Sequence, residues 1–377
     1  MKLFAALAAI LPIVSAVETI ANKTIYVPYD RETFNDPQVL YARSVELDDG
    51  SLLATCEHYS PEPPLVYYPV FRSTDQGKSW THFSNVTDNV NGWGMRYQPQ
   101  LYQLSRRVGK WPKGTVLCAG NSIPIDLSQT RIDMYASVDG GKNWEFASHV
   151  AAGGVALPNN GETPVWEPHI LLHNNRVVVY YADQRQNDTF GQKLSHQTSI
   201  DLEHWTDPED DVVQDTYTDR PGMPSVTQLP TGDWIYMYEN GGFFKTENYS
   251  FPITYRIHKD PLRFNEAKDM VIEVDGVKPV SAPYVNWTPY GGPNGTLVAS
   301  AFGDPRLFTN QMLGAEGHWK AWEIPQPAAY SRSITTFKND SEAIMIIGAG
   351  PNPNPNKTNV LSFSIVKLPE VMGDKKN

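Results

Sequence analysis

The stretch "WEPHILLHNNRVVVYYAD", residues 166–183, carries the pattern that decides the fold. An apolar run is followed by an Asn-Asn turn and by a second run rich in valine and tyrosine, which is typical of a β-hairpin. The chain contains 30 prolines and 27 glycines, and no long segment spaces its apolar residues as an amphipathic helix does. These features predict an all-β protein.

The hairpin pattern repeats along the chain. Its six copies begin near residues 40, 97, 166, 222, 282 and 330, and a third strand follows each copy. Six units of this size suit four-stranded blades, so the sequence predicts a six-bladed β-propeller. The last unit ends without room for a fourth strand. We therefore expect residues 24–27 to pair with residues 361–366 and close the ring.

Two of the third strands run into the pattern Ser-x-Asp-x-Gly-x-x-Trp. The copies are "STDQGKSW" (73–80) and "SVDGGKNW" (137–144), and "SIDLEHW" (199–205) is a third copy that lacks the glycine. The aspartate caps turn amides, the glycine permits a positive φ and the tryptophan packs under the hairpin. We therefore interpret Asp75 and Asp139 as turn-forming residues and assign them no chemistry.

The first sixteen residues have the layout of a secretory signal peptide: Lys2, an apolar run over residues 3–14, and small residues at Ser15 and Ala16. We expect cleavage after Ala16, which leaves one propeller domain, residues 17–377, that is secreted. No later segment is long and apolar enough to be a membrane anchor. Eight Asn-x-Ser/Thr sequons agree with export from a eukaryotic host, at Asn22, Asn85, Asn187, Asn248, Asn286, Asn294, Asn339 and Asn356.

The charge of the chain narrows the possible partners. There are 31 basic and 42 acidic residues, a net charge of −11, and the longest basic cluster is Arg106-Arg107. This composition disfavours nucleic acid and anionic membranes and suits neutral ligands such as sugars. No cluster has the spacing of metal ligands, so we predict no metal and no cofactor. We expect a monomer, in which Cys56 and Cys118 either form a disulfide or remain buried thiols.

Two registers of the repeat point to a common site. A propeller places the start of each inner strand around a central channel, and four of these starts contain a residue followed by proline. The four residues are Gln98, Glu167, Met223 and Ala282, so Glu167 is the one acid at this register. The second register lies seven residues after the turn, at Glu57, Asn121, Asp183 and Glu239. Charged groups that end buried strands on one side of the ring predict the rim of a site.

A pair of carboxylates that face one pocket is the minimum for glycoside hydrolysis. Trp166 and two prolines crowd Glu167, which favours a raised pKa and the role of acid/base. Glu239 is followed by Asn240 and two glycines, whose amides favour an ionised nucleophile. Either acid alone also fits an ordinary ion-pair or rim residue.

The motifs "PVWEPHILL" (164–172) and "DRPGMPSVTQLPTGDWIYMYENGG" (219–242), with glutamates 72 positions apart, resemble glycoside hydrolase family 93. The resemblance extends from about residue 24 to 368. It implies a secreted fungal exo-α-1,5-L-arabinanase that releases arabinobiose from the non-reducing end of arabinan with retention. It also implies that Glu167 is the acid/base, Glu239 the nucleophile and Tyr330 a residue that tunes the nucleophile, although a tyrosine at that place also fits channel packing.

Further residues are candidates for substrate binding. Arg43 stands where sialidases place the first-blade arginine that grips a carboxylate, and in this chain that place suits it to hold a sugar hydroxyl or to orient one of the acids. His169, Asp183, Arg220 and Asn240 lie next to the proposed acids or on the predicted rim, and structural roles fit them equally well. The aromatic candidates for stacking on a sugar are Trp93, Trp166, Tyr284 and Trp287.

Two other functions remain open from the sequence. A sialidase needs three convergent arginines to hold the substrate carboxylate, and only Arg43 stands at an expected place. A glycan-binding propeller without catalysis would offer equivalent pockets in each blade, whereas these blades are unequal and contain a single Glu167/Glu239 pair.

Overall fold

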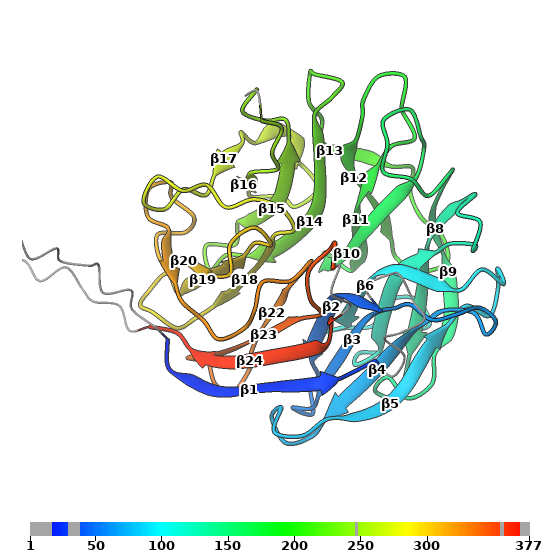
Figure 1. Ribbon diagram of the computed structural model, residues 1–377, viewed down its shortest axis with the longest axis horizontal. Helices are drawn as coiled ribbons and strands as arrows, with labels where there is room; N and C mark the ends of the chain where they lie inside the picture. Colours follow the sequence, from blue (N-terminus) through cyan, green and yellow to red (C-terminus); the bar gives the residue numbers. More distant parts are fainter. Residues whose placement is uncertain (1–16, 29–37, 246–247, 355–357, 370–377) are drawn as a thin grey trace, which may run out of the picture.

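The computed structural model describes residues 17–28, 38–245, 248–354 and 358–369. The predicted signal peptide lies outside these residues. Within them the chain forms 24 strands and one short 3-10 helix, η1 (Phe264–Glu266). The strands make six antiparallel sheets of four strands each, arranged as a ring (Figure 1). The predicted six-bladed propeller is therefore confirmed.

Each blade runs outward from an inner strand at the channel to an outer edge strand. The first three blades are β2 (Val39–Glu46), β3 (Leu52–His58), β4 (Tyr67–Ser73), β5 (Thr81–Thr87); β6 (Met95–Gln103), β7 (Val116–Ser122), β8 (Thr130–Ser137), β9 (Glu145–Gly153); and β10 (Val165–His173), β11 (Arg176–Asp183), β12 (Lys193–Ser199), β13 (Glu209–Val212). The other three are β14 (Arg220–Gln228), β15 (Trp234–Gly241), β16 (Ile253–His258), β17 (Met270–Val271); β18 (Tyr284–Thr288), β19 (Thr296–Ser300), β20 (Leu307–Asn310), β21 (Lys320–Trp322); and β22 (Ser333–Thr336), β23 (Ala343–Gly348), β24 (Leu361–Lys367), β1 (Thr19–Tyr26).

The first strand of the described chain closes the ring. In Figure 1, β1 in blue lies beside β24 in red, and the two pair antiparallel with Asn22 opposite Ser364 and Thr24 opposite Ser362. The expected closure is confirmed, although β1 begins at Thr19 and ends at Tyr26, one residue before the predicted end. This pairing covers β24 and makes β1 the outer edge strand of the last blade.

The Asp-containing turns join neighbouring blades. Asp139 Oδ1 accepts hydrogen bonds from the Ser137 hydroxyl (2.7 Å) and from the backbone N–H of Asn143 (2.9 Å), as expected for a turn-forming aspartate. The Trp144 indole donates to Ser84 Oγ of the preceding blade at 3.1 Å. The turn therefore carries a tryptophan that ties one blade to the one before it, which explains its recurrence in the sequence.

Apolar residues fill the space between adjacent blades. Cys56 and Cys118 lie in this core as free, buried thiols, so the disulfide alternative is wrong. Within the described ranges, no group of three or more His, Cys, Asp or Glu side chains is placed to hold a metal ion. The same residues include no helix with the length and apolarity needed to cross a membrane.

Candidate active site

The inner strands are irregular where they enter the channel. Residues Tyr41, Gln98, Glu167 and Met223 have φ of 51°, 60°, 62° and 56°, and the pairing registers of β2, β6, β10 and β14 shift at these points. A bulge of this kind reorients a side chain, and a positive φ at a non-glycine residue costs on the order of 1–3 kcal/mol. The propeller therefore accepts strain to aim these residues at the channel.

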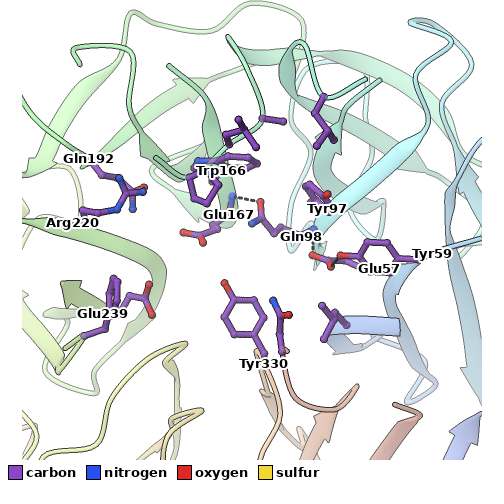
Figure 2. Close-up of a pocket in the computed structure, with 17 residues that line it drawn as sticks. Glu57, Tyr59, Tyr97, Gln98, Trp166, Glu167, Gln192, Arg220, Glu239 and Tyr330 are labelled. Atoms are coloured by element: carbon purple, nitrogen blue, oxygen red, sulfur yellow. Dashed lines mark hydrogen bonds between the residues drawn. The ribbon is translucent and has the colours of Figure 1, made fainter. Parts of the chain in front are cut away.

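A cavity of about 600 Å³ opens at this end of the channel. Its size suits a ligand of a few sugar residues. Figure 2 shows Glu167, Glu239 and Tyr330 pointing into it, with Glu57 on the side away from Glu239. The lining residues are Leu40, Glu57, Tyr59, Tyr97, Gln98, Leu127, Ala156, Leu157, Pro158, Trp166, Glu167, Gln192, Arg220, Glu239, Phe251, Tyr330 and Asn352.

Glu167 is held at the bulge of β10. Its backbone N–H donates to Gln98 Oε1 at 3.0 Å, and its Oε2 accepts from the Met223 N–H at 2.7 Å. The side chain is buried, with 8% of the residue exposed. Burial, followed by the negative charge of Glu239, raises the pKa of the Glu167 carboxyl to about 8. The raised pKa favours the protonated form of Glu167, which is the form that a general acid needs.

Glu239, near the end of β15, has more hydrogen-bond donors. Its Oε2 accepts from the Ala282 N–H at 2.9 Å and from the Ser281 hydroxyl at 3.0 Å. Burial raises the pKa of the Glu239 carboxyl above its ordinary value, although these two donors and the positive charge of Arg220 oppose the rise. Hydrogen bonds to the charged form of a carboxyl favour its ionisation, so the ionised form is better stabilised at Glu239 than at Glu167.

The Cα of Gly222 faces both carboxyls. A Cβ atom at this glycine would lie 3.4 Å from Glu167 Oε2 and 3.5 Å from Glu239 Oε1. The sum of the two distances limits the separation of these oxygens to about 7 Å. This bound includes the roughly 5–5.5 Å typical of retaining glycosidases and only the shortest part of the 6.5–9.5 Å range of inverting ones.

Tyr330 and Arg220 complete the surroundings of the pair. Burial and the charges of Glu167 and Glu239 raise the pKa of the Tyr330 phenol, so it stays protonated. No hydrogen bond joins this phenol to either of these described glutamates, although it points between them (Figure 2). The Arg220 guanidinium donates to Gln192 Oε1 at 2.8 Å and Gln184 Oε1 at 3.1 Å, which holds its charge beside both acids.

This chain shares its fold and about half of its residues with two solved fungal enzymes. The GH93 α-L-arabinofuranosidase of Fusarium graminearum, in complex with arabinobiose, is 51% identical with a TM-score of 0.90, over 93% of this chain and 98% of that one. The chain belongs to glycoside hydrolase family 93. The α-L-arabinanase of Penicillium chrysogenum, complexed with arabinobiose, is 47% identical with a TM-score of 0.89, over 93% of this chain and 98% of that one.

More distant structures show the fold alone. The NanB sialidase of Streptococcus pneumoniae is 12% identical with a TM-score of 0.58, over 92% of this chain and 70% of that one. No protein-family model and no curated protein matches the chain. Membership of family 93 makes the protein a glycoside hydrolase, and the pocket that contains Glu167 and Glu239 is its candidate active site.

Three predicted binding residues of this family 93 enzyme lie deeper in the channel and do not line the pocket. Arg43 is buried, donates from Nε to Gln100 Oε1 at 2.9 Å and stacks over the Tyr41 ring, with 4.0 Å between Cζ and the ring centroid. His169 and Tyr284 line a separate cavity of about 500 Å³ at a lower level of the channel. Arg43 therefore supports the bulge at Tyr41, and its expected direct grip on a sugar does not match its position.

Four other predicted residues also lie away from the family 93 pocket. Asp183 forms an ion pair with Arg185 at 2.7 Å, and Trp93 lies under the guanidinium of Arg131. The Trp287 indole donates to Asn294 O at 2.9 Å, and this ring packs in the core that β15, β16, β18 and β19 share. Asn240 is fully buried and does not donate to Glu239. The donors to the Glu239 carboxylate are the Ser281 hydroxyl and the Ala282 N–H. Trp166 and Arg220 do line the pocket.

The sequence reasoning missed several lining residues of this family 93 pocket. The two registers of the repeat already placed Glu57 and Gln98 at the predicted rim, but neither was assigned a role there. Tyr59, Gln192 and Phe251 lie beyond the strand ends in loops, where no repeat pattern applies. Gly222 directly precedes Met223, which the alignment had already placed at the channel.

Proposed function

We propose that this protein is a secreted, exo-acting arabinan hydrolase that releases arabinobiose from the non-reducing end of α-1,5-L-arabinan with retention at the anomeric carbon. The observation that carries the proposal is the pair of buried carboxyls, Glu167 and Glu239, whose oxygens lie within about 7 Å across Gly222. The two relatives with arabinobiose bound support the substrate.

The unequal surroundings of the pair support their roles. Glu167, with one donor and a pKa of about 8, protonates the leaving oxygen. Glu239, with two donors on one oxygen, attacks the anomeric carbon and forms a glycosyl-enzyme intermediate. Glu167 then acts as a base and activates the water that releases the product. The Tyr330 phenol points between the two acids, which suits it to tune the charge on Glu239 (Figure 2).

The pocket gives less support to a sialidase. Recognition of a sialic acid carboxylate needs several convergent guanidinium groups. Among the described lining residues Arg220 is the one arginine, and Arg43 is occupied with Gln100 and Tyr41. A neutral sugar therefore fits this pocket better than an anionic one.

Product analysis after brief incubation with linear arabino-oligosaccharides tests the proposal. Arabinobiose should accumulate alone, and Glu239→Gln should abolish turnover. Glu167→Ala should spare substrates with activated leaving groups and regain rate with azide, because those reactions need no acid. Sialic acid release from a fluorogenic sialoside, or glycan binding without turnover, would favour the two rival functions.

Secretion is tested separately. Protein recovered from the culture medium should begin at Val17, and retention of residues 1–16 in the mature chain would contradict it.

A further inference from the structure

The channel contains a second cavity, the lower cavity, at a deeper level than the active-site pocket. Its volume is about 500 Å³, and none of the described residues lines both this cavity and the pocket that contains Glu167 and Glu239. All six inner strands contribute to its wall, with residues 44–46, 100–102, 169–172, 226–228, 284–286 and 334–336. At about 3.3 Å per residue, segments of this length make the cavity roughly 10 Å deep, which suits a small ligand.

An apolar layer separates the lower cavity from the active-site pocket. It consists of residues at or beside the strand bulges: Leu40, Tyr41, Met223 and Ala282. The Arg43 guanidinium lies between this layer and the cavity, 4.0 Å from the ring centroid of Tyr41 and 5.2 Å from that of Tyr284. The rim at the other end is exposed, and its residues are Ser105, Arg106, Gln228 and Lys338. A ligand therefore reaches the lower cavity from the face of the propeller opposite the active site.

Three buried polar side chains that line the lower cavity have atoms without a partner. His169, 6% exposed, uses only Nε2, which lies 3.1 Å from both the N–H and the carbonyl oxygen of Val226, so Nδ1 is unpaired in either tautomer. The Tyr284 hydroxyl, on a residue that is 8% exposed, has no hydrogen-bond partner among the described residues. Glu46, 9% exposed, accepts from the Lys338 N–H through Oε2 at 2.7 Å and leaves Oε1 open. Since buried polar groups are almost always paired, these atoms indicate a site for a ligand or for water.

The charges around the lower cavity favour a neutral ligand. Burial lowers the pKa of the His169 imidazole to about 4, so this ring is uncharged at neutral pH. Glu46 has no ion-pair partner among the described residues, because Lys338 at the rim pairs with Asp48 at 2.8 Å, so an anion would meet an uncompensated carboxylate. A cation would find that single carboxylate and the guanidinium of Arg43 close to the cavity wall.

Hydroxyl groups match the atoms that remain open. Glu46 Oε1 accepts from a hydroxyl, and the Tyr284 phenol both donates and accepts. Val226 and Ile334 add apolar surface for the C–H groups of a sugar ring. We infer that the lower cavity is a second, non-catalytic binding site for a short neutral sugar of one or two residues. This inference goes beyond the proposed function, because it requires no reaction at this face of the propeller.

Arabinobiose is the probe that tests the inference, with Glu239→Gln as the parent protein so that no turnover occurs. Crystals of this variant soaked in arabinobiose should show sugar density in the lower cavity as well as in the active-site pocket, and calorimetric titration should show two sites. Adding Glu46→Gln should raise the Kd of the second site about 10- to 100-fold, because hydrogen bonds to a charged group are the stronger ones. The glutamine oxygen can still accept from the Lys338 N–H. Adding Tyr284→Phe should raise this Kd about 2- to 10-fold and keeps the ring beside Arg43.

A tryptophan at Thr227 tests the site by filling it. Thr227 is half-buried and lines the lower cavity. Thr227→Trp should abolish the second site, and in the active enzyme it should leave kcat on an aryl arabinobioside within twofold of wild type. Thr81→Trp is the matched control, because it makes the same substitution at an exposed position of the edge strand β5, and it should retain both sites.

The outcomes separate this inference from the proposed function. A single arabinobiose per chain, confined to the active-site pocket, would overturn the inference, and so would a second site that Glu46→Gln and Thr227→Trp leave unchanged. Loss of the second site only in variants whose Tm falls would also contradict it, since a direct contact must change affinity at unchanged Tm. If sugar occupies the lower cavity but wild type does not cleave arabinan, the proposed function alone is wrong.

Discussion

Replacing Gly222 with alanine tests directly whether the reaction takes place between the Glu167 and Glu239 carboxyls. The added Cβ would lie 3.4 Å from Glu167 Oε2, 3.5 Å from Glu239 Oε1 and 2.8 Å from Gln192 Nε2. Since ordinary contacts begin at 3.4 Å, the Gln192 amide must move by about 0.6 Å, and a methyl group then stands between the two carboxyls. The methyl group occupies space that the reacting sugar needs, so the sugar must shift by about 1 Å, and a misplacement of that size costs about 10²-fold in rate.

We therefore expect Gly222→Ala to lower kcat/KM about 10²-fold on an aryl arabinobioside, equivalent to about 2.7 kcal/mol of transition-state stabilisation. Folding should be little affected, because the φ of Gly222 is not in the left-handed region and alanine restricts the unfolded chain. Tm measured by scanning fluorimetry should stay close to that of wild type.

Gln192→Ala is the matched control, since it removes the crowded amide without adding a methyl group. The double variant Gly222→Ala/Gln192→Ala should remain as impaired as Gly222→Ala if the methyl between the carboxyls causes the loss. Activity of Gly222→Ala within twofold of wild type, at equal Tm, would refute the placement of the reaction between Glu167 and Glu239.

Three further variants probe ionisation and folding. Because the Glu167 pKa is raised to about 8, the stability that this carboxyl contributes is complete below its unfolded pKa and is lost as the pH rises through about 8. Glu167→Gln removes this loss, so the Tm of the variant minus that of wild type should be larger at pH 8 than at pH 4. An equal difference at both pH values would contradict this. Asp139→Ala should lower Tm by a few degrees with kcat unchanged, because its hydrogen bonds shape a turn remote from the pocket, and a fall in kcat would show a role beyond that turn. Deletion of residues 17–26 should produce aggregation detectable by light scattering, since it exposes the edge of β24 along its full length, whereas a soluble protein with unchanged Tm would show that β1 is dispensable.

The repeat pattern predicted most of the fold because it follows from alternation and turn chemistry, which are local. The residue-proline dipeptides correctly located the bulges at Gln98, Glu167 and Met223. They also located Ala282, which has a positive φ and lies just before β18. The equivalent bulge at Tyr41 has Ala42 in place of proline, so the same pattern does not reveal it. The ring closure was predictable because the last repeat lacked a strand.

The site was only partly predictable because register does not determine the partner of a side chain. Glu57, Asp183 and Glu239 occupy the same place in three repeats, yet Asp183 turns to Arg185, two residues further along the chain. Arg43 and His169 belong to inner strands, but their side chains lie at deeper levels of the channel than Glu167. The lining loops that contain Gln192 and Phe251 both connect the second and third strands of their blades, but they differ in length and sequence, so no repeat pattern places their side chains.

The stereochemistry of the product is the most direct test of the central claim that Glu167 and Glu239 act on opposite sides of one sugar ring. When linear arabinan is cleaved in the presence of methanol, proton NMR of the first product should show methyl α-L-arabinobioside. Glu239 covers one face of the anomeric carbon in the glycosyl-enzyme intermediate, so methanol attacks from the face where the leaving group had been. Formation of the methyl β-anomer would contradict the claim, since it requires direct attack by methanol on the bound substrate, with no glycosyl-enzyme intermediate on Glu239.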